Sequence, residues 1–411
     1  MNELVKNDFP LFEEIDHKKL VSDSFRCRST KDSLRLVMKK IRHLGITRIS
    51  DITDLDHIGI PVISAIRPAV SDLQITATQG KGLKKIDAYV SALMEAVERF
   101  SLGNFSEFTT APQGELIREN INFLHPNLLG CKVNQDSVLD WVKSTCLSSG
   151  ASYLVPAADV VFPYTPKPGI TRPVRPSTTG ASSGNTKAEA LLHAMFEVIE
   201  RDTVSKFFIG GSASIVDLNS IESKSEQNLI VRFQNAGLDI LALDLSALSP
   251  IPVYYVSILN TKGIGPDIAC AGQGAHLNPC IAFRRALTEA AQSRAVAIQG
   301  SREDLIRHAS DWKGSHEQFT AMRNQIKIQA LHSGGITSLT ENLKNSFSIK
   351  EALQLLQKKL AASGYNKIFY TDLTHPTIQI PVIHTIIPGL TDNIVEPSRL
   401  RVLPRDLHRL H

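Results

Sequence analysis

Hydrophobic and polar positions follow two different periods along this chain of 411 residues. Apolar residues spaced three and four apart predict helices over 30–44 (ended by Gly45), 84–103, 186–208, 279–299 and 349–363. Aliphatic runs predict strands over 238–246, 251–260, 367–373 and 380–388, and broken strands over 45–68. Segment 151–165 is expected to form a strand and a loop, whereas 300–345 is polar and weakly patterned. With no clean linker between independent domains, this alternation predicts a mixed α/β or α+β fold.

Composition and charge narrow the class of protein. The chain is 42% hydrophobic and 21% charged, with a mean hydropathy of −0.06, as in globular proteins. A net charge of +4 with scattered bases does not favour nucleic-acid binding. The five cysteines include no Cys-x-x-Cys pair, and the sequence has neither a signal peptide nor an apolar run long enough to span a membrane. We therefore expect a reduced, cytoplasmic enzyme or binding protein without nucleic-acid or membrane partners.

One motif, Glu-x-x-Glu-Arg, occurs twice behind helix-forming residues. The segment GKGLKKIDAYVSALMEAVER (80–99) aligns with SSGNTKAEALLHAMFEVIER (182–201), so that Glu95 matches Glu197. A third segment, GAHLNPCIAFRRALTEAAQSR (274–294), places Glu289 at the same position. Each has small residues, then a helix, then an acid about fourteen positions beyond the small-residue turn. This pattern predicts three similar helices that present polar residues to one shared cleft.

Helical geometry places the acids of each motif together. Glu95, Glu98 and Arg99 fall on one face of the first helix, bordered by small residues. The acids that share a face of the second helix are Glu189, Glu197 and Glu200. Clustered glutamates need cations as partners, because uncompensated buried charge is costly.

Two interpretations of these helices remain open from the residues alone. In the first, the motif is a solvated face on which acids and bases three and four apart pair weakly. In the second, it is a divided site in which carboxylates hold Mg²⁺ and guanidinium groups hold phosphate oxygens. The arginines available for phosphate are Arg99, Arg201 and Arg285.

Other motifs give weaker signals. GASSG (180–184) matches the Gly-x-Ser-x-Gly pattern of hydrolases, but the preceding RPVRPSTT cannot form a central strand, so a turn that meets an anion is the better interpretation. Thr186 and Glu189 have the spacing of a helix capping box. The GKG at 80–82 resembles a phosphate turn but is not a Walker A motif. Four histidines without metal-ligand spacing are expected to be structural or surface residues: His193, His276, His308 and His384.

A family resemblance becomes specific at the repeated helices. TATQGKGLKKIDAYVSALMEAVERFS, SSGNTKAEALLHAMFEVIERD and GAHLNP with RRALTEAAQSR resemble the three signature segments of the YcaO family, over 76–102, 180–203 and 272–295. GITRISDITDLDHIGIPVISAIRP and DLTHPTIQIPVIHTIIPGL extend the resemblance toward the subgroup that works with TfuA-like partners. It implies an α+β fold with mixed sheets and long, pseudo-repeated helices around a central ATP/Mg²⁺ cleft. It also implies an N-terminal segment (1–70) that contributes to the nucleotide site, followed by a YcaO domain (71–411).

The resemblance assigns roles by motif position. The implied Mg²⁺ ligands are Glu95, Glu98, Glu197 and Glu200. The implied contacts to ATP or its metals are Arg26, Ser33, Lys81, Arg99, Asn185, Glu189, Arg201, Arg285 and Glu289. The implied catalytic residues are Glu197, Glu200 and Arg201.

The family chemistry implied is ATP-dependent phosphorylation of a peptide or protein backbone amide, after which a nucleophile displaces phosphate. External sulfide gives a thioamide, whereas a Cys, Ser or Thr side chain of the substrate gives an azoline. Azoline-forming members often end in Pro-x-Pro-x-Pro, whereas this chain ends in VLPRDLHRLH with the single nearby Pro404, which favours thioamide formation.

The expected partners follow from that chemistry. With no appended leader-binding or ubiquitin-activating-like domain, we expect a peptide or protein substrate and a TfuA-like sulfur-delivery partner, and a homodimer is compatible with the sequence. Two alternatives stay open. The chain could be an azoline- or amidine-forming enzyme, or a non-catalytic accessory protein for another modifying enzyme such as a ribosomal protein methylthiotransferase.

Overall fold

Two compact units of interleaved segments make up the chain. The computed structural model describes residues 25–71, 73–173, 176–260, 269–301, 316–339 and 347–392. Unit 1 comprises segments 1–29, 97–205 and 347–411, and unit 2 comprises 30–96 and 206–346. The divisions at 96/97 and 205/206 fall within the two helices that carry the Glu-x-x-Glu-Arg motif, α3 (Lys85–Gly103) and α5 (Lys187–Phe208). The predicted family boundary between residues 70 and 71 stays a prediction.

Unit 2 contains two sheets. The first is a three-stranded antiparallel sheet of β1 (Arg48–Asp51), β2 (Val62–Ile66) and β3 (Ala77–Lys81). The second has the order β11-β10-β9-β8-β12. Its strands are β8 (Ser214–Val216), β9 (Leu238–Asp244), β10 (Val253–Asn260), β11 (Ala269–Ala275) and β12 (Ile336–Thr337). Only the short edge strand β12 pairs in parallel in this sheet, with β8.

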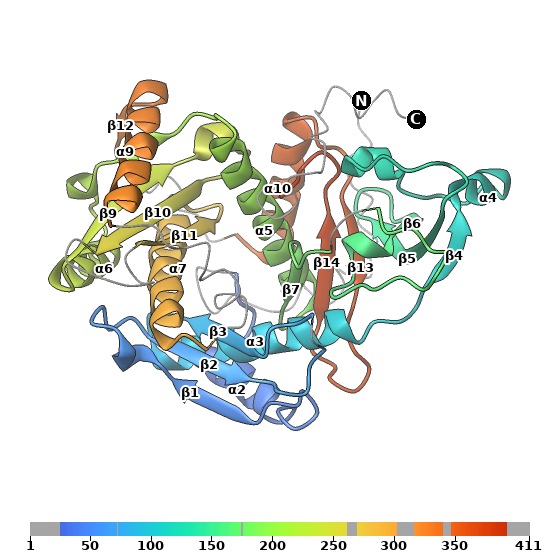
Figure 1. Cartoon of the computed structure of the whole chain (residues 1–411), viewed down its shortest axis with the longest axis horizontal. Helices are drawn as coiled ribbons and strands as arrows, with labels where there is room; N and C mark the ends of the chain where they lie inside the picture. The colour runs from blue at the N-terminus through green and yellow to red at the C-terminus, as the bar shows by residue number, and fades with distance from the viewer. Residues whose placement is uncertain are drawn as a thin grey trace. The chain divides into compact units, whose positions relative to one another are not determined.

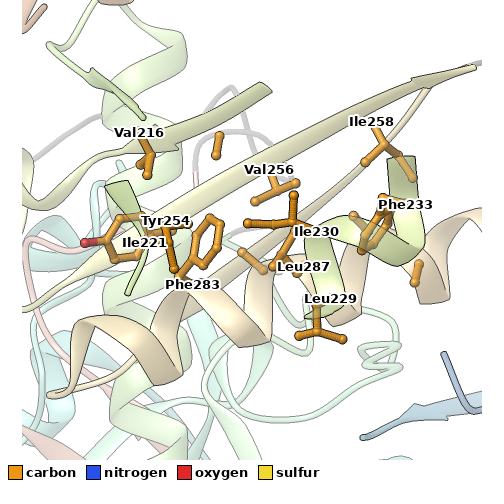
Figure 2. Close-up of a cluster of buried hydrophobic side chains, with 14 of the residues drawn as sticks. Val216, Ile221, Leu229, Ile230, Phe233, Tyr254, Val256, Ile258, Phe283 and Leu287 are labelled. Atoms are coloured by element: carbon orange, nitrogen blue, oxygen red, sulfur yellow. The ribbon is translucent and has the colours of Figure 1, made fainter. Parts of the chain in front are cut away.

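Helices α6 (Lys224–Asn235) and α7 (Pro279–Gln299) supply apolar side chains to one core with this second sheet. Figure 2 shows Phe283 and Leu287 of α7 gathered with Tyr254 and Val256 of β10 and with Phe233 of α6. Burying such aromatic and aliphatic side chains is worth about 1.5–3 kcal/mol each. Unit 2 also contains helices α2 (Thr30–Met38) and α9 (His316–Ser333).

Local sequence sets the ends of α7. The Asn278 side chain accepts hydrogen bonds from the amides of Cys280 and Ile281, and Pro279 occupies the first helical turn, where its missing N–H costs nothing. Gly300 ends the helix in the left-handed conformation, with φ of 64°. These signals explain why the predicted range 279–299 coincides with the helix.

Unit 1 is built on one antiparallel sheet of order β4-β5-β13-β14-β7, in which β6 also pairs with β5 (Figure 1). Its strands are β4 (Thr109–Pro112), β5 (Val138–Cys146), β6 (Ser152–Pro156), β7 (Ala181–Ser183), β13 (Phe369–Asp372) and β14 (Val382–Ile386). Among the described residues, the α-helices wholly inside unit 1 are α4 (Gln113–Arg118) and α10 (Ile349–Ala362). Helix α10 starts with a complete capping box between Ser348 and Glu351.

The expected α+β class is confirmed, and the five predicted helices all exist. Four match their predicted bounds within a residue, but α2 stops at Met38 and the chain continues to Gly45 as turns. The segment 300–345 is polar and weakly patterned, so the pattern predicted no helix there, and the structure places α9 within it. No helix in the described part of the chain has the length and apolar character to cross a membrane.

Candidate functional site

Three strand-to-helix units carry the repeated motif: β3 to α3, β7 to α5 and β11 to α7. In each unit, a glycine without a Cβ lets the helix backbone pack in close contact with the strand backbone. A Cβ on Gly80 would lie 2.0 Å from the Ala92 nitrogen, and one on Gly272 would lie 2.3 Å from the Ala290 nitrogen. A Cβ on Gly184 would lie 2.5 Å from a backbone nitrogen of α5. The small residues that precede each helix are therefore required by close packing.

The close approach brings a strand amide to a helix carboxylate in two of the three units. The Gln79 N–H donates to Glu95 Oε2 at 3.1 Å, and the Gln273 N–H donates to Glu289 Oε1 at 3.4 Å. Donor and acceptor are 16 residues apart in both pairs. The predicted repeat between the first and third helices therefore extends to the orientation of the carboxylate.

The unit of α5 departs from this pattern. The residue at the equivalent position before Glu197 is Ala181, and its N–H donates to the Thr178 carbonyl at 3.1 Å. That amide is consequently not available to Glu197. The equivalent acids of the repeat therefore lie in different electrostatic environments.

Glu98 is instead the carboxylate that strand β7 holds. Both the N–H and the hydroxyl of Ser183 donate to Glu98 Oε1, at 2.7 and 2.8 Å. Hydrogen bonds to a charged acceptor are stronger than neutral ones, so they fix the orientation of this carboxylate.

Glu197 lies among like charges within unit 1. Burial is the largest of the causes that raise the pKa of Glu197 from 4.5 to about 8, and the nearby carboxylates of Glu98 and Glu200 add to it. The guanidinium groups of Arg201 and Arg99 oppose this rise but do not cancel it. A divalent cation beside these oxygens would supply the missing positive charge, so this donor set fits Mg²⁺.

Glu189 has the opposite electrostatic balance. It is fully buried, and burial alone would raise its pKa, but Arg26 and the other donors hold the pKa below the usual value. Arg26 Nη1 lies 2.7 Å from Oε1, and both the N–H and the thiol of Cys27 donate to Oε2 at 3.1 Å. The Asn185 amide also donates to both oxygens. The structure thus brings together the predicted Arg26, Asn185 and Glu189.

The capping-box alternative for Glu189 is half correct. The Thr186 hydroxyl accepts the Glu189 N–H at 3.2 Å, as in a capping box. The Glu189 carboxylate, however, accepts hydrogen bonds from Arg26, Cys27 and Asn185. Its main role is to join the start of α5 to the chain that precedes α2.

Unit 2 holds the remaining predicted residues. Lys81 Nζ lies 2.5 Å from Glu289 Oε2, so strand β3 and helix α7 are joined through two predicted nucleotide contacts. Arg285 Nε is buried and has no hydrogen-bond partner within the described chain. A buried guanidinium donor in need of an acceptor fits a phosphate oxygen. Ser33 is buried in α2.

The structure therefore separates the predicted site residues into two sets. Those in unit 1 are Arg26, Glu98, Arg99, Asn185, Glu189, Glu197, Glu200 and Arg201, and those in unit 2 are Ser33, Lys81, Glu95, Arg285 and Glu289. Among the described residues, no group of three or more His, Cys, Asp or Glu side chains has a ready-made metal-binding arrangement. The four-glutamate Mg²⁺ set and the nucleotide contacts stay predictions.

Sequence reasoning missed the groups that orient these carboxylates: the amides of Gln79 and Gln273, both donors of Ser183, and Cys27. The 16-residue spacing from strand to acid was a readable signal for the first two. Of the histidines expected to be structural or surface residues, His193, His276 and His384 are buried. His308 lies outside the described residues, as does the C-terminal VLPRDLHRLH.

Comparisons with known proteins agree on one family. The model of the family described as "YcaO cyclodehydratase, ATP- and Mg2+-binding" matches residues 79–391. An uncharacterized protein of Methanothermobacter thermautotrophicus is 34% identical over 375 residues, which cover 90% of this chain and 96% of that protein. A protein of Rhizobium leguminosarum bv. trifolii, described as lying in the tfuA 3′ region, is 28% identical over 371 residues, which cover 86% of each chain.

Solved structures share the fold. The YcaO protein of Methanopyrus kandleri, bound with AMPPCP and Mg²⁺, matches with a TM-score of 0.74 and 22% identity, covering 94% of this chain and 98% of that one. A heterocyclase in complex with substrate and cofactor matches with a TM-score of 0.71 and 19% identity, covering 93% of this chain and 55% of that one.

Proposed function

We propose, from the premise that this chain belongs to the YcaO family, that it phosphorylates a peptide or protein backbone amide with ATP and prepares it for thioamide formation with a sulfur donor. Members of this family are ATP-dependent enzymes that act on peptides, and ATP and Mg²⁺ are the cofactors.

The single observation that carries the proposal is the state of Glu197. Burial and the neighbouring Glu98 and Glu200 raise the pKa of this carboxylate to about 8, so added positive charge beside it would be favourable. A structural ion pair would instead lower the pKa of its acid, as happens at Glu189. Glu98, Glu197 and Glu200 of unit 1 would hold Mg²⁺.

Mg²⁺, when bound, neutralises charge on the phosphate oxygens during phosphoryl transfer. The chain's residues do the positioning. Ser183 fixes Glu98, so this carboxylate is oriented before the metal arrives. Arg201 and Arg285 would donate to phosphate oxygens.

The proposed reaction has two steps. The amide oxygen of the substrate attacks the γ-phosphorus of ATP, and ADP leaves. A hydrosulfide ion then attacks the activated amide carbon and forms a C–S bond, the C–O bond to the phosphate breaks, and the proton of the hydrosulfide leaves with the phosphate as hydrogen phosphate, so that a thioamide remains. The protein contributes orientation and charge in both steps, which are the main terms in catalysis of phosphoryl transfer.

The Rhizobium relative described as lying in the tfuA 3′ region favours thioamidation and a TfuA-like sulfur-delivery partner for this chain. A second candidate is azoline formation, favoured by the cyclodehydratase description of the matching family.

Peptide mass separates the two candidates. The chain would be incubated with ATP, Mg²⁺, sulfide and candidate peptides, with and without a TfuA-like protein. Thioamidation replaces oxygen by sulfur and raises the mass, whereas cyclodehydration removes one water and lowers it. Parallel reactions with Glu197→Gln and Glu119→Gln, the second an exposed acid of unit 1, test the metal site. Phosphate release at background in every combination, with an unchanged cellular phenotype for Glu197→Gln, would support the accessory-protein alternative instead.

A further inference from the structure

Strand β5 has two partners in succession along one edge. On that edge, β4 pairs with Val138–Trp141, and β13 pairs with Thr145 and Cys146. Strand β6 covers Trp141–Thr145 on the opposite edge. Figure 1 shows β5 within this sheet of unit 1. The segment 142–144 therefore faces an interval in which neither neighbour continues the ladder.

The main chain of Lys143 points into this interval. Lys143 lies opposite Leu154 of β6, but the Leu154 N–H donates to the Asn122 carbonyl at 2.9 Å and its carbonyl accepts from the Leu124 N–H at 2.8 Å. Both polar groups of Leu154 thus point away from β5, so Lys143 and Leu154 form a non-hydrogen-bonded pair. The N–H and C=O of Lys143 must face the other edge, where the described registers of β4 and β13 stop short of it.

A groove of about 460 Å³ opens at this interval. This volume lies within the range of about 300–1,000 Å³ that ligand pockets occupy. Its walls carry aromatic rings, Phe105, Phe108 and Tyr370, together with charges of both signs, among them Glu107 and Lys143. The Phe108 ring contacts the Phe105 ring edge-on, yet 38% of Phe108 remains exposed. Main-chain donor and acceptor, aromatic surface and mixed charge together are the features that bind an extended peptide.

The groove is joined to the predicted nucleotide residues of unit 1. Asp372 lines the groove, and its Oδ2 lies 2.7 Å from Lys187 Nζ. Lys187 is the first residue of α5, two positions after Asn185, whose amide holds Glu189. A chain lying in the groove therefore passes beside the helix start that carries these residues.

We propose that this groove binds the substrate peptide in an extended conformation, with one of its residues paired to the N–H and C=O of Lys143. The inference rests on the proposed function and adds the subsite that holds the peptide beside the reacting amide. Two acidic side chains on the walls, Glu107 and Asp372, disfavour a nucleic acid as the occupant.

The first test uses the wild-type chain, so it does not depend on the folding of a variant. A library of random linear peptides displayed on their mRNAs is selected on the full chain with Mg²⁺ and a non-hydrolysable ATP analogue. Each amide of an enriched peptide is then N-methylated in turn, and Kd is measured by fluorescence anisotropy. We expect one position at which N-methylation weakens binding about tenfold or more, because the methyl group removes the N–H donated to the Lys143 carbonyl.

The second test uses variants. Phe105→Ala combined with Phe108→Ala should weaken the same peptides about tenfold, because their aromatic contacts are lost. Ile117→Ala removes an exposed apolar side chain of α4 outside the groove and should leave Kd unchanged. Hydrogen exchange should slow at the Lys143 amide when peptide binds.

The outcomes separate this inference from the proposed function. Binding of Mg²⁺ and ATP is measured on every protein by calorimetry, and its absence in the wild type would count against the proposed function. If the wild type binds nucleotide but enriches no peptide over bare beads, the groove assignment is wrong. The assignment is equally wrong if the Phe105→Ala/Phe108→Ala variant keeps the wild-type Kd and N-methylation weakens binding at no position of the peptide.

Discussion

At the scale of single residues, Glu197 is set apart from its counterparts by a missing donor. Glu95 and Glu289 each accept a strand amide, whereas the amide equivalent for Glu197 bonds Thr178. A lost hydrogen bond and like-charged neighbours both favour the protonated acid. The raised pKa of Glu197 follows mainly from burial and then from the nearby carboxylates of Glu98 and Glu200, while the amide at the equivalent position of β7 is bonded to Thr178.

This pKa predicts how stability depends on pH. Between pH 4.5 and about 8 the folded protein keeps a proton on Glu197 that the unfolded chain releases. Stability is therefore full below this range and falls as pH rises through it. Glu197→Gln should flatten the decline, as measured by melting temperature against pH without Mg²⁺ or ATP. Glu119→Gln should reproduce the wild-type slope, and equal slopes for all three proteins would refute the assignment.

Ser183 gives a second prediction at this scale. Ser183→Ala removes the hydroxyl bond to Glu98 at 2.8 Å and keeps the amide bond at 2.7 Å. We expect the apparent affinity for Mg²⁺ to fall about tenfold, because a bond to a charged group is worth about 1.5–3 kcal/mol. The readout is the Mg²⁺ dependence of ATP turnover. The neighbouring Ser182→Ala is the control, and a similar loss there would show a general effect on β7.

His384 predicts sensitivity to acid. Burial in strand β14 lowers the pKa of His384 from 6.5 to about 4, against the opposing effect of the Thr179 backbone. Between pH 6.5 and about 4 the unfolded chain binds a proton at His384 that the folded protein does not bind. Stability that is present above pH 6.5 is therefore lost as the pH falls toward 4. His384→Gln should reduce this loss in thermal melts. His43→Gln, at an exposed site, should not.

At the scale of elements, the site is organised by helices that lie against strands through glycine. A Cβ at residue 80 would overlap the Ala92 nitrogen at 2.0 Å, so Gly80→Ala must push α3 away from β3. We expect a loss of about 1–3 kcal/mol or more and a lower melting temperature. Gly114→Ala is the matched control, because its nearest neighbour would be 3.8 Å away and alanine favours helix α4. A wild-type melting temperature for Gly80→Ala would contradict the packing argument.

Helices and strands differed in how far the sequence predicted them. Helices α5 and α7 have strong start signals and long runs of residues that form helix, so their predicted ends match within a residue. Strands β7 and β11 consist of small residues such as ASS and ACAGQGA, which lack the branched and aromatic side chains that mark a strand. These strands need small residues because the helix backbone packs directly against them, and this packing can be seen only in the folded chain.

At the scale of the whole molecule, nucleotide binding should stabilise the fold. A ligand that binds only the folded state adds about 2.7 kcal/mol at about 100 times its Kd. We expect Mg²⁺ with ATP to raise the melting temperature, and EDTA to abolish most of the rise. Glu197→Gln should show a smaller shift than the wild type. An equal shift in EDTA would indicate that carboxylate-bound metal is not part of the site.

The sequence by itself determined the class of fold, the long helices and, through three ordered motifs, the family. These are properties of local pattern, because helix periodicity and motif spacing are written along the chain. Only the tertiary structure decided which donor each carboxylate receives, that Glu189 joins Arg26 and Cys27, and that Lys143 faces an open sheet edge. Those features depend on contacts between residues as far apart as Arg26 and Glu189, whose separation of 163 positions leaves no mark on a local pattern.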